Sequence, residues 1–196
     1  MTIGSGVPGD AHLAEGRRVV REEIDALQRT YEKLGESFSR SVDMMATSGK
    51  VIVSGVGKSG LIGRKIVATL VSTGKRAVFL HPVEALHGDI GIVEPGDCAL
   101  LLSKSGNTTE LIKLIPSLKT RQTGIIGILG TIDSPLAKLS DIVLDASVER
   151  EACPLNAAPM SSTTVALVLG DALAAALMKQ HNFSVGQFAS FHPLGQ

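Results

Sequence analysis

Apolar residues recur at helical spacing through the first quarter of the chain. At steps of three and four, the apolar positions are Val19, Val20, Ile24, Leu27, Tyr31, Leu34 and Phe38. Charged residues fill the opposite face, which is the pattern of an amphipathic helix. We expect one long helix or two consecutive helices over residues 11–48, preceded by a flexible N-terminus at residues 1–10 that contains glycine and proline.

From residue 51 onward, short apolar runs alternate with helical patterns. The predicted strands are 51–54, 77–80, 98–102, 124–129 and 141–144, and the predicted helices are 61–72, 82–87, 108–118, 135–139 and 162–180, followed by a short tail at 184–196. Strands that are apolar throughout are buried on both faces, which is typical of a parallel sheet covered by helices. We therefore expect a single α/β domain over residues 11–196, with a doubly wound five-stranded parallel sheet of order 2-1-3-4-5. This is a flavodoxin-like αβα sandwich.

Composition narrows the classes of protein that remain. Of the 196 residues, 44% are hydrophobic and only 3% are aromatic, so the core must be aliphatic. Nineteen basic residues balance nineteen acidic ones, and this chain lacks the basic field that attracts nucleic acid or a membrane surface. Cys98 and Cys153 give neither a disulfide framework nor a zinc site. The start of the chain does not resemble a signal peptide, and the apolar stretch 164–178 is too short to span a bilayer and is interrupted by Gly170 and Asp171. We expect a cytoplasmic protein.

The first candidate loop, residues 54–60, reads Ser-Gly-Val-Gly-Lys-Ser-Gly and lies between a strand and a helix. It matches the G-x-G-x-x-G dinucleotide fingerprint, which is a weak signal alone. The acidic residue that would hold a ribose is missing, because the second strand ends Phe-Leu-His at 79–81. A Walker A loop would need glycine where Ile52 stands. No nucleotide or other cofactor is therefore expected. Either the glycines serve a tight turn for steric reasons, or the backbone approaches a ligand closely and Lys58 reaches into the site.

The second candidate loop, residues 103–110, reads Ser-Lys-Ser-Gly-Asn-Thr-Thr-Glu and opens another helix. Three hydroxyls, a glycine and the free N–H groups of a helix start would form a cradle for a phosphate. The alternative is ordinary helix capping, which one hydroxyl would satisfy. In a sheet of order 2-1-3-4-5, strands one and three are neighbours, and ligands bind at that switch point beyond the carboxyl ends of the strands. The two loops are thus expected to lie side by side.

Four segments together resemble a known family. They read SGVGKSG, LHPVEALHGDIG, LLSKSGNTTEL and EREACPLNAAPMSSTTVALVLGDALA. They are similar to the sugar isomerase (SIS) domain of arabinose-5-phosphate isomerases from about Val19 to the end. The resemblance implies interconversion of ribulose 5-phosphate and arabinose 5-phosphate for the synthesis of Kdo, by a homo-oligomer that is often a tetramer. Many members continue into a pair of CBS modules. This chain ends where they would begin, and so resembles the form without them.

The resemblance also implies the site residues. The residues that match the family's active site are Lys58, Glu110, Glu151 and His192, with His87 close by. Ser103, Ser105 and Thr108 match its phosphate-binding positions. The two loops themselves add Ser54, Gly55, Gly57, Lys104, Gly106 and Asn107 to the residues expected to bind substrate. Moving a carbonyl between C1 and C2 through a cis-enediol needs a base at carbon, a proton donor near the oxygens and charge stabilisation, but no redox cofactor.

The roles within this set stay open at this point. Glu151 is the candidate carbon base and Glu110 the alternative. Without a catalytic role, Glu151 would be an exposed acid in a charged run, and Glu110 would stabilise the first turn of its helix. The tail residue His192 would act on a neighbouring subunit's site if the tail packs there. His81 and His87 are too far apart in sequence for a strong metal signal, so no metal is expected. Two other functions compete: a non-catalytic sugar-phosphate-binding module, and an isomerase of another sugar phosphate such as a hexulose 6-phosphate.

Overall fold

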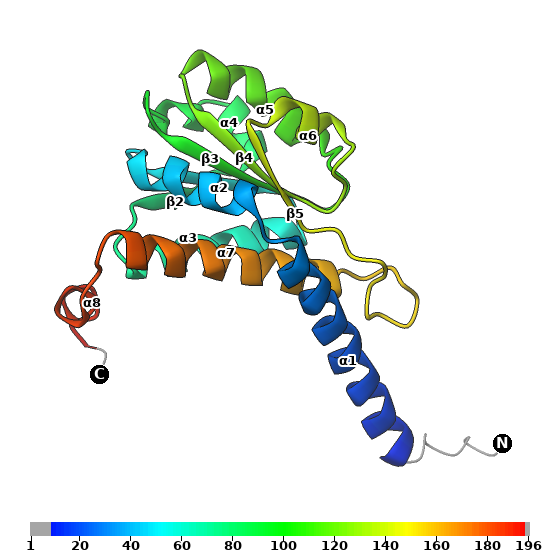
Figure 1. Cartoon of the computed structure of the whole chain (residues 1–196). Coiled ribbons are helices and arrows are strands. Elements are labelled where there is room, and N and C mark those ends of the chain that lie inside the picture. Colours follow the sequence, from blue (N-terminus) through cyan, green and yellow to red (C-terminus); the bar gives the residue numbers. More distant parts are fainter. Residues whose placement is uncertain (1–8, 195–196) are drawn as a thin grey trace.

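A computed structural model of the chain describes residues 9–194, and its centre is one five-stranded sheet (Figure 1). The strands are β1 (Val51–Gly55), β2 (Ala77–Phe79), β3 (Cys98–Ser103), β4 (Gly124–Leu129) and β5 (Ile142–Asp145). All neighbouring pairs are parallel, and the order is β2-β1-β3-β4-β5. The predicted fold class and strand order are confirmed.

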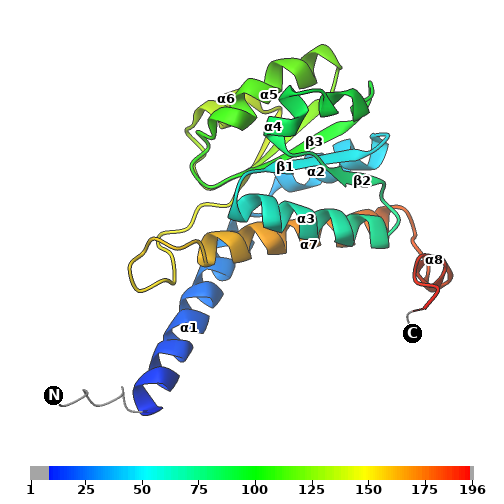
Figure 2. The ribbon, with the colours of Figure 1, turned by 180° about the vertical axis from the view of Figure 1, so that it is seen from behind.

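Helices cover both faces of this sheet (Figures 1 and 2). One layer contains α1 (Gly9–Lys33), α2 (Glu36–Thr47), α3 (Lys58–Ser72) and α7 (Ser161–Gln180). The other contains α4 (Pro82–Leu86), a short 3-10 helix at Asp89–Ile92, α5 (Thr109–Thr120) and α6 (Pro135–Leu139). Each layer has its own buried aliphatic cluster against the sheet, which explains why the strands carry no polar alternation.

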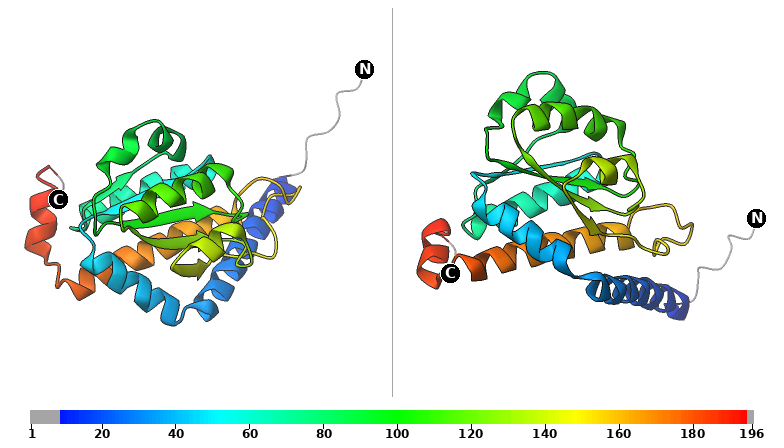
Figure 3. Two further views of the ribbon diagram at one scale, coloured as in Figure 1. Left: turned by 90° about the horizontal axis from the view of Figure 1, so that it is seen from above. Right: turned by 45° about the horizontal axis from the view of Figure 1, so that its top comes forward.

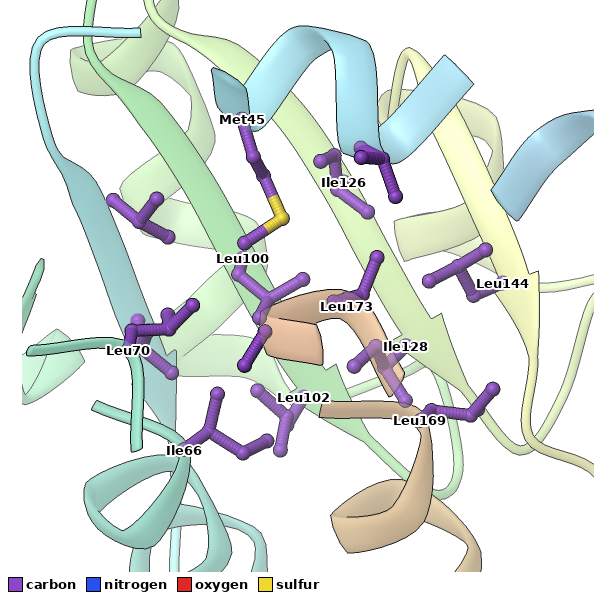
Figure 4. Close-up of a cluster of buried hydrophobic side chains, with 14 of the residues drawn as sticks. Met45, Ile66, Leu70, Leu100, Leu102, Ile126, Ile128, Leu144, Leu169 and Leu173 are labelled. Carbon is purple, nitrogen blue, oxygen red and sulfur yellow. The ribbon is translucent and has the colours of Figure 1, made fainter. Parts of the chain in front are cut away.

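Alternate residues of one strand feed the two clusters. Leu100 and Leu102 of β3 face α3 and α7, whereas Ala99 and Leu101 face the layer of α5. Figure 4 shows the first of these clusters, with Leu100 and Leu102 beside the side chains of α3 and α7. The core holds α3 and α7 firmly, and these two helices begin at the edge of the sheet where the two candidate loops lie.

Several boundaries differ from the sequence-based expectation. The third helix begins at Lys58 rather than Leu61, because Gly57 turns the chain directly into it with a φ of 60°. The expected loose segment at residues 1–10 falls mostly outside the described residues, but Gly9 and Asp10 already belong to α1. The tail contains an unpredicted helix, α8 (Val185–Phe191). Its signal was in the sequence, because Ser184 and Gln187 form a capping box.

The expectation that the apolar stretch 164–178 is too short to span a bilayer was wrong. At 20 residues, α7 is long and apolar enough to cross a membrane, and it is the one such helix among residues 9–194. However, Val165, Leu169 and Leu173 are almost entirely buried in the core cluster, and α7 packs on α1, α2 and α3. The core helix of a globular domain has the same character.

The two ends of the described chain leave the body of the molecule in different places (Figure 3). The first half of α1 projects beyond the sheet, on the side where α7 begins. Helix α8 lies beyond the other end of α7. An α-helix rises 1.5 Å per residue, so the two ends of α7 are about 30 Å apart. The tail of a chain is therefore remote from the carboxyl edge of its own sheet.

Candidate functional site

A cleft lies at the carboxyl edge of the sheet, between the two candidate loops and the start of α7. It consists of two adjoining hollows that share Ser103 and Lys104. The first also has Lys58, Ser59 and Ser162 in its wall and a volume near 170 Å³. The second hollow measures about 430 Å³ and is also lined by Ser105, Thr108, Gly130 and Thr131. The latter volume is within the range of small-molecule sites.

The strand register explains why the two loops meet. Gly55, the last residue of β1, pairs with Leu102 of β3, one residue before Ser103. The loops that follow β1 and β3 therefore leave the sheet side by side, as predicted. Lys58 is the first residue of α3 and lines the first hollow, so its backbone is fixed by the helix.

The glycines of the first loop have different functions. A Cβ on Gly55 would lie 3.1 Å from the backbone of Ser59, and one on Gly60 only 2.8 Å from the Gly55 oxygen. Tight packing of the turn therefore explains Gly55 and Gly60. Gly57 has a positive φ and open space around its Cα. The Ser54 hydroxyl is buried and donates to the Leu80 carbonyl at 2.6 Å, so it ties β1 to β2 and does not line the cleft.

The second loop is organised by its own hydroxyl groups. The oxygens of Ser103 and Thr108 lie 2.8 Å apart, and the Gly106 N–H donates to Ser103 Oγ at 3.0 Å. The Asn107 N–H donates to Ser105 Oγ at 3.2 Å. Thr108 is the N-cap residue of α5, yet its side chain makes no capping hydrogen bond. Simple capping therefore does not explain the hydroxyls, and the positive end of α5 is left for an anion.

One ion pair crosses the cleft from the second loop to the start of α7. Lys104 Nζ lies 2.6 Å from Glu151 Oε1, and the Glu151 side chain is fully buried whereas that of Lys104 is half exposed. The Met160 and Ser162 N–H groups donate to Glu151 Oε2 at 2.8 and 3.2 Å. The Ser162 hydroxyl donates to Oε1 at 2.5 Å. Glu151 is therefore not the exposed loop acid that its charged neighbours suggested.

These contacts set the ionisation of Glu151. Burial on its own raises the pKa of a carboxyl group, because the charged form loses its hydration. Here the hydrogen bonds from Lys104, Ser162 and the Met160 amide outweigh burial, and the pKa of Glu151 lies below its ordinary value. The carboxylate is thus charged at neutral pH.

The family model described as the SIS domain matches residues 44–176, which is more than half of the chain. This chain belongs to the SIS domain family. The matched residues include both candidate loops and the Lys104–Glu151 pair.

Individual SIS relatives cover nearly all of this chain. "Arabinose 5-phosphate isomerase GutQ" of Salmonella typhimurium is 48% identical over 187 residues, 95% of this chain. The chain spans 58% of the length of that relative. The solved structure of the E. coli CFT073 protein c3406, in complex with arabinose 5-phosphate, has a TM-score of 0.91 at 35% identity, covering 95% of this chain and all of the other. "Arabinose 5-phosphate isomerase KdsD" of Pseudomonas aeruginosa is 47% identical over 93% of this chain and 56% of its own.

Four of the five expected catalytic residues lie outside the walls of the two hollows: Glu151, which contacts Lys104, and Glu110, His87 and His192. Glu110 is half buried in the first turn of α5, and His87 is exposed at the end of α4. His192 follows α8, where its ring stacks on Phe188 with centroids 3.9 Å apart and its Nδ1 lies 2.8 Å from the Phe188 carbonyl oxygen. It is at the far end of α7 from the cleft of its own chain. Their catalytic roles stay predictions.

Sequence reasoning missed two contributors to this SIS site. Ser162 touches Glu151 and lines the first hollow, although the run Ser-Ser-Thr-Thr at 161–164 is as rich in hydroxyls as the second loop. Gly130, after β4, lies so close to Lys104 that a Cβ there would come 2.6 Å from the Lys104 oxygen. No local motif in the sequence marks that contact, because the sheet creates it.

Proposed function

We propose that this SIS chain is an aldose–ketose isomerase that interconverts ribulose 5-phosphate and arabinose 5-phosphate through a cis-enediol. The observation that carries the proposal is the uncapped start of α5, ringed by Ser103, Ser105 and Thr108, in a cleft that Lys58 and Lys104 also line. Relatives named arabinose 5-phosphate isomerase, and a similar structure that holds arabinose 5-phosphate itself, support this choice of substrate.

The phosphate group would sit at the second loop. A phosphate dianion there would accept hydrogen bonds from the hydroxyls and from the N–H groups of the first turn of α5, and the helix dipole favours its charge. The sugar carbons would then extend along the cleft toward Lys58 and the start of α7. This order places C1 and C2 near the charged side chains and away from the phosphate seat.

The chemistry needs one proton moved between C1 and C2 and another moved between their oxygens. A carboxylate base would remove the carbon-bound proton, and Glu110 and Glu151 are the candidates. Lys58 would stabilise the negative charge that develops on the enediolate oxygen. Hydrogen returned to the neighbouring carbon completes the isomerisation without any net oxidation, so the reaction itself requires no redox cofactor.

The test is to follow ribulose 5-phosphate in D2O by NMR with the purified protein. We expect arabinose 5-phosphate that carries deuterium at C2. Failure of the folded protein to turn over ribulose 5-phosphate would reject the isomerase proposal. Tight binding without turnover would favour the non-catalytic sugar-phosphate-binding module, and faster turnover in a panel of other aldose and ketose phosphates would favour a different isomerase. If the activity holds, the product would supply Kdo synthesis in the cytoplasm.

A second copy of the chain is the proposed source of His192 at each site. Within one chain, about 30 Å of helix separates the start of α7 from α8. Two variants test this arrangement: Lys58→Ala and His192→Ala should each be inactive alone. Mixed and allowed to exchange subunits, they should recover activity, because some sites then contain both intact side chains. No recovery after demonstrated exchange would reject a role in trans.

The outer face of α1 is the proposed contact between copies. We call Leu13, Val20, Ile24 and Tyr31 the α1 stripe; their exposed fractions are 53%, 58%, 47% and 71%. These residues recur at helical spacing, and the opposite face of α1 already packs on the body through Ala26 and Thr30. Such a second apolar stripe on a projecting helix is typical of a subunit interface.

Charge along α1 favours a second copy as the occupant. On the exposed side, Arg17 and Arg21 lie in the first half of the helix, and Asp25 and Glu32 lie in the second. Two α1 helices packed antiparallel about a two-fold axis would place basic residues opposite acidic ones. Replacing Ile24 with Glu should lower the molar mass measured by light scattering, whereas Val71→Glu, at an equally exposed apolar position on α3, should not. An unchanged mass for Ile24→Glu would reject this face.

A further inference from the structure

We propose that Glu151 is a positioning residue that holds the Lys104 ammonium group in the cleft, and that it is not the base that removes the carbon-bound proton. This inference rests on the proposed function, because it assigns roles within the same reaction. It leaves Glu110 as the candidate carbon base.

The first argument concerns the oxygens of Glu151. Oε1 accepts from the Ser162 hydroxyl and contacts Lys104 Nζ, and Oε2 accepts from the Met160 and Ser162 N–H groups. An ionised carboxylate has about four acceptor positions, and here four donors occupy them. A carbon-bound proton would have to displace one of these donors before Glu151 could accept it.

The second argument is access and basicity. The Glu151 side chain is fully buried, whereas Glu110, in the first turn of α5, is only half buried. A general base works best with a pKa near the operating pH. The hydrogen bonds from Lys104 and Ser162 overcome burial and hold the pKa of Glu151 below the ordinary glutamate value, which makes it a weak base.

The third argument concerns what Glu151 does to Lys104. The Lys104 side chain is half exposed and lines both hollows, so it lies where they join. An ammonium group has three N–H donors, and the contact with Glu151 uses one of them. The other two are left for oxygens of a sugar phosphate. Without Glu151, a flexible lysine chain would leave this position more often, because nothing else described on the far side of the cleft anchors it.

The charged neighbours of Glu151 support a dedicated role. Glu149 lies 3.6 Å from Arg29 of α1, and Arg150 lies 4.0 Å from Glu22 of the same helix. These two residues turn outward to α1, and only Glu151 of the charged run turns inward to the cleft. The Glu151 N–H is also fixed, because it donates to Asn156 Oδ1 at 2.7 Å. The loop therefore aims one carboxylate at Lys104.

The test is a double-mutant cycle of Glu151→Gln and Lys104→Met. Lys104→Met should raise KM about 10- to 100-fold, the value of a charge-assisted hydrogen bond, with a smaller change in kcat. Glu151→Gln should change KM in the same direction and should retain hydrogen exchange with D2O at the reacting carbons. In the Lys104→Met background, Glu151→Gln should have almost no further effect, because the group that it positions is gone.

The opposite result is equally clear. If Glu151 is the carbon base, Glu151→Gln should lower kcat about 10²- to 10⁴-fold and stop the exchange, and it should do so in the Lys104→Met background as well. Additive losses would therefore overturn the inference. Lys65→Met is the matched control, because it removes a similarly exposed lysine from an ion pair with Asp171, between α3 and α7 and outside the hollows.

Failure of the inference can be separated from failure of the proposed function. If the wild type binds arabinose 5-phosphate but does not turn it over, the isomerase proposal fails. The same cycle is then measured from Kd by calorimetry, where non-additive losses still support positioning and additive losses still reject it. Thermal unfolding of each variant shows whether the fold is intact.

Discussion

Two glycines with nearly the same positive φ offer a direct test of how the second loop is built. Gly57 and Gly106 have φ values of 60° and 63°. No described atom outside its own turn lies within 4 Å of a Cβ placed on Gly57. A Cβ on Gly106 would lie 2.5 Å from Ser134 Cβ, would clash with Ser134 Oγ and would lie 3.0 Å from the Thr131 oxygen. Alanine at each position therefore combines a positive φ with very different surroundings.

The expected magnitudes follow from these surroundings. Gly57 has φ 60° and ψ −128°, a backbone conformation that side chains other than glycine rarely adopt, so Gly57→Ala should lose about 1–3 kcal/mol of free energy of unfolding. Overpacking adds about 1–3 kcal/mol, so Gly106→Ala should lose about 2–5 kcal/mol. Alanine also reduces the entropy of the unfolded chain, but this effect is the same for both variants. An excess loss in Gly106→Ala would thus reflect the clash with the loop after β4.

The assay is urea unfolding of both variants, with a third variant as the control. Ser134→Gly added to Gly106→Ala should recover at least about 1 kcal/mol, because it removes the atoms that the new methyl group meets. Ser134 also caps α6 by accepting from the Ala137 N–H, but glycine at an N-cap costs only a few tenths of a kcal/mol. Equal losses for Gly57→Ala and Gly106→Ala, with no recovery in the double variant, would refute the reasoning.

Three further predictions concern groups around the core and the cleft. Folding lowers the pKa of Glu151, so its contribution to stability is present above the unfolded-state pKa of about 4.3 and is lost as pH falls through the folded-state pKa. In urea unfolding from pH 6 to pH 3, the free energy of unfolding should therefore decline less steeply for Glu151→Gln than for the wild type. Burial raises the pKa of Cys98 to about 12, whereas hydrogen bonds from backbone N–H groups of the following loop lower the pKa of Cys153. A thiol reagent at pH 8 should therefore label Cys153 first and Cys98 only after unfolding, which peptide mapping would show. A Cβ on Gly170 would lie 2.5 Å from Ile66 Cδ1, so Gly170→Ala should lower the free energy of unfolding by about 1–3 kcal/mol even though alanine favours helix.

The fold could be predicted because the strands are short and mainly apolar, and because the three central strands, β1, β3 and β4, are buried on both sides. A run such as Gly124–Leu129 has no polar position that would suit a solvent-facing strand, and its predicted bounds match the structure. The predicted first residue of a helix was less accurate where a glycine turn begins the helix. Nothing in the periodicity showed that Gly57 turns the chain straight into α3, because that depends on a single positive φ. The short helix α8 was missed because seven residues are too few to show a helical period, although its capping box is present in the sequence.

The candidate site could be predicted only in part, for a similar reason. Local sequence placed hydroxyls and glycines at the ends of β1 and β3, and the strand order brought them together. The burial of Glu151 depends on contacts with Ser162 and Lys104, which are 11 and 47 residues away along the chain. In sequence it looks like one of three exposed charges. A long-range contact therefore changed the interpretation of the residue on which the proposed chemistry most depended.

The geometry of α7 separates two kinds of contribution to the proposed site. Its first turn holds Glu151, and through it Lys104, inside one chain, so that pair is complete in an isolated subunit. Its last turn leads to α8 and His192, which can reach a cleft only if another copy presents it. Activity that needs His192 must therefore fall on dilution as copies separate, whereas binding of the phosphate at the second loop need not. If dilution weakens binding and turnover in parallel, the division of the site between one chain and its neighbour is wrong.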